Sequence, residues 1–426
     1  MINKIKIEKS AWAWSFYDWA NSAFATTVMA GFFPIFFKEF WSYGANPIAS
    51  SLRLGIGSSI AGIIIALIAP ILGSFADVGR NRKWFLVIFA LLGAAFTGLL
   101  YLVPQGAWYL AMVFYIIAGV GFFGSNIFYD ALLPHTTSEQ NFHLVSSIGY
   151  SLGYLGGGIL FAFNVVTVLQ PDFFHITSSA EAVKLSFVSV ALWWLLFTIP
   201  LLVFVTEKEN GRITKSIDSI LKNGWKQYIN TYRDIKKYKN LALFLLAYWF
   251  YIDGVDTIVR MAVDYGLSLG FNKNDLIVAL IITQFTGFPA ALLYVYFAHK
   301  IGIKRSLLSG ILIYLLICIW AAFIREKSDF YLIAFSIGCV QGGVQALSRS
   351  IYSLLIPADQ SAEFFGFYNM FGKFAVIIGP LLMSSTSYII LGITDSENIA
   401  IRSGIVSIGL LFIAGSILLT KVKFEE

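Results

Sequence analysis

Long apolar segments, separated by polar connectors, run along the whole chain. Each holds about 20 apolar residues, which is the length that a helix needs to cross a bilayer. Because lipid offers no partner for unpaired backbone groups, each segment is expected to be an α-helix. The pattern therefore predicts an all-α membrane protein with twelve transmembrane helices. The predicted helices cover residues 12–38, 53–76, 84–103, 107–131, 142–168, 184–205, 241–266, 275–298, 306–324, 330–353, 365–390 and 400–420.

The composition supports the same class. Of the 426 residues, 58% are hydrophobic and 13% are charged, whereas soluble domains hold about 25% charged residues. Lysine and arginine indicate the orientation. Placing the N-terminus in the cytoplasm puts most of the 30 lysine and arginine residues on the cytoplasmic side, in agreement with the positive-inside rule. Both termini are then predicted to be cytoplasmic. The net charge of +6 is a topology signal and requires no nucleic-acid partner.

The two halves of the chain repeat one another. The motif Tyr-Asp-Ala-Leu-Leu-Pro at 129–134 recurs as Tyr-Ser-Leu-Leu-Ile-Pro at 352–357, and the same shift takes Gly156 to Gly379. Two parallel six-helix halves are typical of transporters with a site near the bilayer midplane. The longest polar stretch separates the halves. The predicted bundles and the cytoplasmic linker between them are residues 1–205, 241–426 and 206–240, respectively.

Several motifs carry a resemblance to a known family. They are residues 17–24 (YDWANSAF), 128–134 with 149–157, 253–255, and 342–350 with 362–366. In these motifs the chain resembles the major facilitator superfamily, and within it the vacuole effluxer (autophagy-related) family and its bacterial relatives. The resemblance implies secondary transport by alternating access. It also links the vacuolar members to amino-acid efflux.

Two loops differ from the superfamily's usual pattern, which is Gly, three residues, Asp, two residues, Gly and then basic residues. In the loop between the second and third spans, Gly73 and Asp77 fit, but Gly79 comes one position early. In the second half, His299 stands where an Asp is expected, ahead of Arg305. The two loops are therefore related but not equivalent.

The first of these loops is a candidate conformational latch. Asp77, Arg80, Arg82 and Lys83 lie where a short cytoplasmic loop touches neighbouring helices. The alternative is that these charges only set the topology of the chain.

Charges at the cytoplasmic ends of three spans are candidates for a gate. Asp130 lies near the end of the fourth span, Arg349 has the same place in the tenth, and Lys373 lies in the eleventh. The first half thus offers an acid and the second half offers bases. Charges inside a membrane tend to find opposite partners, so we hypothesise an ion-pair gate between the halves. The alternative is that each charge is satisfied within its own half or reaches the interface.

Polar residues in the first, fourth and tenth spans are candidates for the substrate or proton pathway. An ionisable group at a helix centre costs about 2.5–3.5 kcal/mol on insertion scales, so Asp18 is more useful facing a wet cavity than lipid. For the other candidates, an interhelical hydrogen bond explains the residue as well as a substrate contact does. These candidates are Asn21, Asn126, Tyr129 and Gln345.

The seventh span carries four charges on one helical face. Asp253, Asp256, Arg260 and Asp264 follow one another at spacings of three and four residues, which keeps them on one side of a helix. Either Asp256 or Asp264 can pair with Arg260. Asp253 is then left as a proton carrier or substrate contact. The alternative is a structural set of charges that holds the helix in register.

The sequence shows no catalytic triad, nucleotide-binding loop or metal-ligand spacing, so we predict no enzyme activity, no cofactor and no metal site. The predicted function is secondary active transport of a small polar solute, for which an amino acid is one candidate. We expect proton-coupled symport or antiport by a monomer in a bacterial inner membrane. The alternative is a non-transporting membrane protein, such as a receptor or assembly partner, which would tolerate neutralisation of Asp18 and Asp253.

Overall fold

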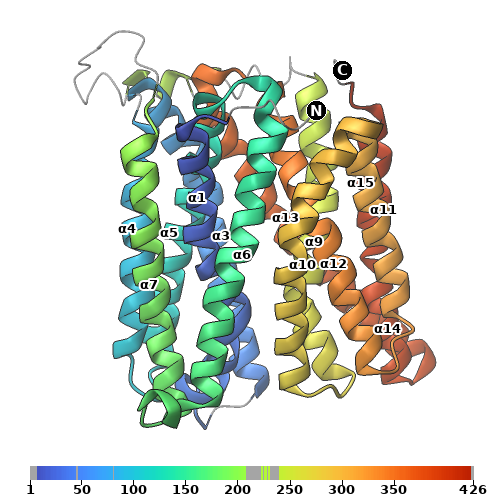
Figure 1. Ribbon diagram of the computed structural model, residues 1–426. Helices are drawn as coiled ribbons and strands as arrows, with labels where there is room; N and C mark the ends of the chain where they lie inside the picture. Colours follow the sequence, from blue (N-terminus) through green and yellow to red (C-terminus); the bar gives the residue numbers. More distant parts are fainter. Residues whose placement is uncertain are drawn as a thin grey trace. The chain divides into compact units, whose positions relative to one another are not determined.

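The computed structural model describes residues 7–44, 47–79, 81–207, 222–223, 225–227, 229–230 and 239–423. All regular secondary structure in these ranges is helical. Figure 1 shows long helices running beside one another within each half of the chain.

The first span is wound unevenly. It begins as α1 (Lys9–Ala23), continues as the π-helix η2 (Phe24–Phe32), and ends with α2 (Phe33–Phe36) and a second π-helix, η3 (Phe37–Trp41). Pro34 lies between the two π-helices and has no N–H to give to the helix ladder. On both sides of it, backbone bonds reach back five residues, as from Phe33 to Val28. The sequence predicted a helix here but gave no sign of this wider winding.

The remaining helices follow in the expected order. In the first half they are α3 (Pro47–Gly79), α4 (Arg82–Leu99), α5 (Trp108–Thr136), α6 (Phe142–Leu169) and α7 (Ser179–Phe204). In the second half they are α9 (Lys239–Ser268), α10 (Lys273–Ile301), α11 (Ile303–Ala321), α12 (Lys327–Leu355), α13 (Ser361–Thr394), α14 (Glu397–Ser407) and α15 (Gly409–Lys421).

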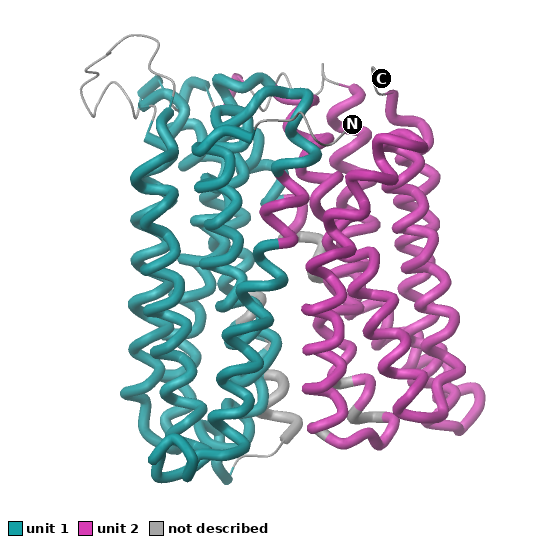
Figure 2. Tube along the Cα trace, in the orientation of Figure 1, with its two compact units in different colours: residues 1–145, 152–228, 357–370 teal, residues 146–151, 229–356, 371–426 magenta. Residues whose placement is uncertain are grey.

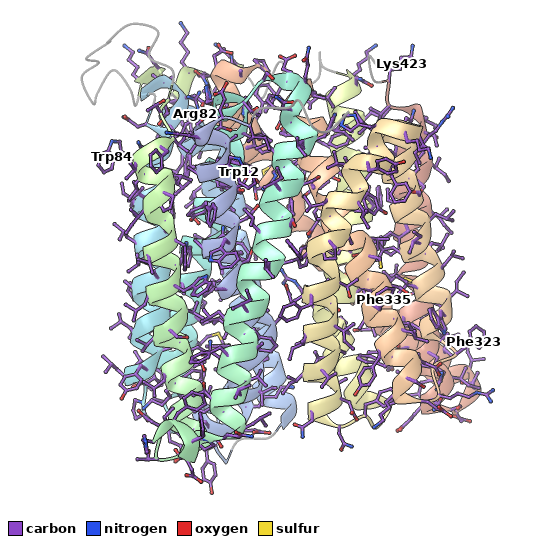
Figure 3. All side chains as sticks on the ribbon, in the orientation of Figure 1. Trp12, Arg82, Trp84, Phe323, Phe335 and Lys423 are labelled. Atoms are coloured by element: carbon purple, nitrogen blue, oxygen red, sulfur yellow. The ribbon has the colours of Figure 1, made fainter. Side chains whose placement is uncertain are left out.

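The helices have the length and surface of membrane spans. Among the described residues, eleven segments are long and apolar enough to cross a membrane, with α14 and α15 together forming one of them. The helix α13 completes the series of twelve. Large apolar side chains such as Trp84 and Phe323, 63% and 69% exposed, lie on the outside of the helices (Figure 3), as expected for a lipid-facing surface. The predicted all-α, twelve-helix membrane fold is confirmed.

The chain divides into two compact units (Figure 2). Unit 1 consists of residues 1–145, 152–228 and 357–370, and unit 2 of residues 146–151, 229–356 and 371–426. A short piece of α6 is thus grouped with unit 2, and the start of α13 with unit 1. The domain division into 1–205 and 241–426, with a linker at 206–240, remains a prediction.

Glycines bring the first helix of unit 1 close to α6. A Cβ atom at Gly153 would lie 2.6 Å from the Ser22 hydroxyl, and one at Gly156 would lie 2.6 Å from the Trp19 ring. Only glycine permits this approach without displacing a neighbour. The contact fixes the turn of α1 that carries Asp18, which is the first of the candidate site residues.

Candidate functional site

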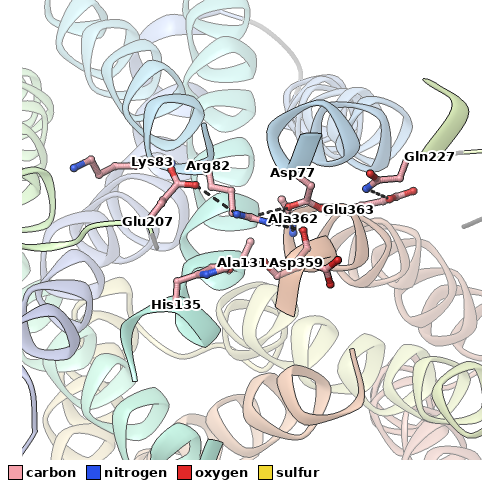
Figure 4. Close-up of polar contacts among 11 residues, drawn as sticks. Asp77, Arg82, Lys83, Ala131, His135, Glu207, Gln227, Asp359, Ala362 and Glu363 are labelled. Atoms are coloured by element: carbon pink, nitrogen blue, oxygen red, sulfur yellow. Dashed lines mark hydrogen bonds and ion pairs between the residues drawn. The ribbon is translucent and has the colours of Figure 1, made fainter. Parts of the chain in front are cut away.

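A buried ion pair joins the end of α3 to the start of α4. Asp77 and Arg82 are 6% and 3% exposed. The Nε and Nη2 atoms of Arg82 lie 2.7 and 2.6 Å from Oδ1 of Asp77 (Figure 4). Two N–H groups of one guanidinium therefore meet a single carboxylate, which is a strong, charge-assisted arrangement.

The same carboxylate binds the first turn of α13. The backbone N–H groups of Ala362 and Glu363 donate to Oδ1 and Oδ2 of Asp77 at 3.0 and 2.8 Å. The first N–H groups of a helix have no partner within the helix, and a negative charge is favourable there. Gly73 allows the approach, because a Cβ atom at this position would lie 2.3 Å from the carbonyl oxygen of Ala362. Asp77 therefore caps α13 from another helix.

Arg82 extends this contact to two further segments. Its Nη2 donates to the carbonyl oxygen of Asp359 at 2.8 Å, just before α13. Its Nη1 lies 3.4 Å from Oε2 of Glu207, just after α7. The predicted latch residues Asp77 and Arg82 are thus brought together, whereas Arg80 lies outside the described residues. We call Asp77, Arg82 and the start of α13 the latch cluster.

Sequence reasoning missed three partners in the latch cluster. Glu207 and Asp359 lie more than a hundred residues from Arg82 in the chain, and the first N–H groups of α13 carry no side-chain signal. One hint was available, because the motif Ala-Glu-Phe-Phe-Gly at 362–366 includes the residues that Asp77 caps. Gln227 also belongs here, since its amide donates to Oε2 of Glu363 at 2.7 Å (Figure 4).

The pathway candidates of the first and fourth spans meet in pairs in unit 1. Tyr129 on α5 donates its hydroxyl to Oδ2 of Asp18 at 2.8 Å. One turn further along α1, the Asn21 amide donates to Oδ1 of Asn126 at 2.5 Å. Trp14 stacks on the Tyr129 ring at 4.2 Å. Four of the predicted residues therefore form one polar layer between α1 and α5.

Arg349 on α12 is 2% exposed, and two of its nitrogens bind neutral groups within unit 2. Its Nε and Nη2 donate to the hydroxyl and carbonyl oxygens of Ser146, each at 2.9 Å. The guanidinium also lies 4.3 Å from the centre of the Tyr150 ring, a favourable cation–π distance. The Ser146 hydroxyl in turn donates to the carbonyl oxygen of Ala346 at 2.9 Å. These serine contacts were not predicted, because serine carries no charge pattern to read.

The other two gate candidates are Asp130 and Lys373. Asp130 on α5 is buried, with 8% exposure, and it belongs to unit 1. The side chain of Lys373 lies outside those described. The ion-pair gate of Asp130 with Arg349 and Lys373 stays a hypothesis.

Asp253 on α9 is 1% exposed and meets the backbone of α13 in unit 2. The N–H of Gly379 points between its two oxygens, at 3.0 Å from Oδ1 and 3.1 Å from Oδ2. The hydroxyl of Thr257, one turn along α9, donates to Oδ1 at 3.3 Å. Neither Gly379 nor Thr257 was among the predicted partners.

The other candidates of unit 2 are more open. Asp256 and Gln345 are half-buried and Arg260 is exposed. Asp256 and Arg260 do not come within ion-pairing distance of one another. The alternative partner of Arg260, Asp264, has a side chain outside those described. Among the described residues, no group of three or more histidine, cysteine, aspartate or glutamate side chains could hold a metal ion.

Solved structures of known proteins share this fold. The human organic anion transporter MFSD10 (TETRAN) superposes with a TM-score of 0.70 at 13% identity, covering 96% of this chain and 99% of that one. The major facilitator superfamily transporter FucP, in an outward conformation, gives a TM-score of 0.67 at 13% identity, covering 98% of both chains. The fold is that of a major facilitator transporter, an integral membrane protein.

Sequence comparison narrows the assignment. The family model described as "Vacuole effluxer Atg22 like" matches residues 43–143 and 136–426. An uncharacterized MFS-type transporter of Bacillus subtilis, YxiO, is 38% identical over 97% of this chain and 94% of its own. The autophagy-related protein 22 of Yarrowia lipolytica is 23% identical over 76% of this chain and 69% of its own. The chain belongs to the Atg22-like vacuole effluxer family. The Bacillus relative and both solved structures are named as transporters.

Proposed function

We propose that this protein is a secondary active transporter that moves a small polar solute by alternating access, coupled to protons. The supporting observation is a buried acid in the first helix of each half. Asp18 is 8% exposed and Asp253 is 1% exposed, although a charge inside a spanning helix is costly and usually marks an ion or substrate pathway.

The proposed solute is an amino acid or a similar zwitterion. Asp256 and Arg260 lie one turn apart on α9 and do not neutralise one another, so opposite charges are available along a single helix. This suits a solute that carries both an ammonium and a carboxylate group. The vacuole effluxer name of the family supports export of a solute. Symport and antiport with protons both fit this proposal.

The two predicted bundles, 1–205 and 241–426, are the bodies that alternate in this proposal. The latch cluster holds α13 against α3 in one state and releases it in the other. Asp130 pairs with Arg349 and Lys373 to close the cytoplasmic side. Proposed with this are a bacterial inner membrane, both termini and the 206–240 linker in the cytoplasm, and a monomeric transporter.

A charge swap tests the gate directly. Asp130→Arg and Arg349→Asp should each abolish transport, and the double variant should restore part of it if the two side chains pair. Absence of any rescue, with both single variants folded, would remove this pairing from the mechanism. Ser146→Ala is a useful companion, because it weakens the neutral contacts of Arg349 without changing charge.

Reconstitution tests the function as a whole. Purified protein in proteoliposomes should show counterflow of at least one radiolabelled solute in a screen of amino acids, metabolites and drugs. Accumulation of that solute should depend on an imposed pH gradient. The alternative of a receptor or assembly partner predicts no flux of any solute and normal behaviour of Asp18→Asn and Asp253→Asn in cells.

A further inference from the structure

The contact between Asp253 and Gly379 is shared by both carboxyl oxygens. The N–H of Gly379 lies almost equally far from both oxygens, at 3.0 and 3.1 Å. An ionised carboxylate spreads its charge over two accepting oxygens, whereas a protonated one carries a donor on one of them. Adding a proton would turn one of the two acceptors into an O–H and remove the negative charge from the other, which weakens the contact.

Gly379 is required for the contact. A Cβ atom at this position would lie 1.9 Å from the Thr257 hydroxyl oxygen and 2.7 Å from Oδ1 of Asp253. Any side chain here would push α13 away from α9. The nearby Gly372 differs, because among the described residues a Cβ atom there would meet the Tyr248 ring and hydroxyl, at 3.5 Å or more.

The contact lies at a weak point of α13. Pro380 follows Gly379 directly and lies inside the helix. Proline cannot donate to the carbonyl one turn back, and its ring disturbs that turn. Helices bend at such positions. The carboxylate of Asp253 therefore holds α13 at the step where the helix ladder is interrupted.

The helix α9 is fixed on its other side. A Cβ atom at Gly254 would lie 2.7 Å from the Phe412 ring of α15, and one at Gly415 would lie 2.9 Å from Cβ of Tyr251. Glycines thus press α9 and α15 together on both helices. If the contact with Gly379 opens, α9 stays packed on α15, and α13 is released from α9 at this step while Gly404 of α14 still packs on Met383 of α13.

We propose that Asp253, Thr257 and Gly379 form a proton-sensitive clasp between α9 and α13, closed when Asp253 is ionised and open when it is protonated. Gly379 and Thr257 are then positioning residues for the proposed proton carrier. This proposal rests on the proposed function and adds to it the step that couples proton uptake to helix movement. The proton is taken up on one carboxylate oxygen, and the Gly379 N–H keeps only the other oxygen, now without its negative charge, as an acceptor.

Few other charges bear on the clasp. On α9 itself, Asp256 is half-buried and Arg260 is exposed. On α12, Arg349 is bound to Ser146. On α15, the charged side chain is Lys421, in the last turn. On α13, the side chain of Lys373 lies outside those described. Because Asp256 and Arg260 carry opposite charges, variants that neutralise them should shift the pH of opening in opposite directions.

The distance between two spin labels can report the opening of the clasp without a transport measurement. Spin labels are placed on the purified full-length chain at Tyr388 on α13 and Leu410 on α15, which are 80% and 59% exposed. Lowering the pH should change the distribution of distances between the labels in the otherwise unaltered protein. Asp253→Asn should give the low-pH distribution at every pH. A distance distribution that changes neither with pH nor with this substitution would overturn the clasp proposal.

Matched variants separate the clasp from general damage. Gly379→Ala should show the open distribution and lower pH-driven accumulation on the order of tenfold, whereas Gly372→Ala should behave as the parent. Thr257→Val should shift the pH of opening and Thr257→Ser should not. Failure of the proposed function would appear differently, as absence of solute flux with the pH-dependent distance change intact. Equal behaviour of the two glycine variants in the label measurement would overturn the proposal.

Discussion

The loop between α3 and α4 and the loop between α10 and α11 are related in sequence, and the structure shows what each retains. Both place a lysine on the last helix of its half. Lys83 donates to the carbonyl oxygens of Leu202 and Val205, at 3.0 and 2.9 Å. Lys304 donates to those of Thr420 and Val422, at 2.7 and 2.8 Å. A cation at a helix C-terminus is favourable, and this function is common to both loops.

The loops differ in the acid. Asp77 binds Arg82 and the start of α13, whereas His299 and Arg305 of the second loop are exposed. Among the described side chains, Arg305 forms no ion pair. In both loops a basic residue is enough to anchor the loop to the last helix of its own half. Binding the start of α13, which lies far away in the chain, also requires the Asp77 carboxylate at the end of α3.

The largest expected effect is that of Asp77→Ala. The substitution leaves the buried Arg82 with only its longer ion pair to Glu207, and removing one partner of a buried pair costs about 3–5 kcal/mol. The melting temperature in detergent should fall clearly. His299→Ala in the second loop should change stability by less than about 0.5 kcal/mol. Equal shifts for the two variants would erase the difference between the loops.

Arg82→Lys is expected to come next. Lysine keeps the charge but cannot place two N–H groups on Asp77 while also reaching the carbonyl of Asp359. We expect a loss of about 1–3 kcal/mol, measured by thermal unfolding of the purified protein. Arg305→Lys is the matched change in the second loop and should have no measurable effect. A stable Arg82→Lys variant would mean that charge alone suffices at this position.

Glu207→Gln should have a smaller effect. Oε1 of Glu207 accepts the backbone N–H of Lys83 at 2.9 Å, and glutamine keeps an acceptor for it. The lost ion pair with Arg82 is long and partly exposed, so the change should stay below about 1 kcal/mol. Denaturation in detergent at low and high salt would measure it, with the difference from the parent shrinking in high salt.

The smallest effects should be those of Lys83→Met and Lys304→Met. Each removes a cation from a helix C-terminus, which is worth about 0.3–1 kcal/mol. Because both loops share this contact, the two variants should lose the same amount of stability. A loss confined to Lys83→Met would show that the anchoring is not common to the two halves.

The sequence predicted the helices well because hydrophobic segments of membrane length are a strong signal. It also grouped Asp77 with Arg82, and it named Asp18 and Tyr129 separately as pathway candidates. It could not supply their partners when these were backbone groups or neutral side chains. The N–H of Gly379 and the hydroxyl of Ser146 bind charges, yet nothing in a glycine or serine marks it as a charge partner. The π-helices of the first span were also unpredicted, because winding depends on hydrogen-bond register and not on composition.

The capping of α13 by Asp77 has a consequence for how the protein is made. The acid and the N–H groups it binds are 285 and 286 residues apart. At about 5–20 residues per second, ribosomes need tens of seconds to deliver α13 after Asp77 has been synthesised. During that interval the Arg82 guanidinium, only five residues away in the chain, is already available to pair with the Asp77 carboxylate. Until then the Asp77 carboxylate is charge-balanced but caps no helix, and the latch cluster is completed only near the end of translation.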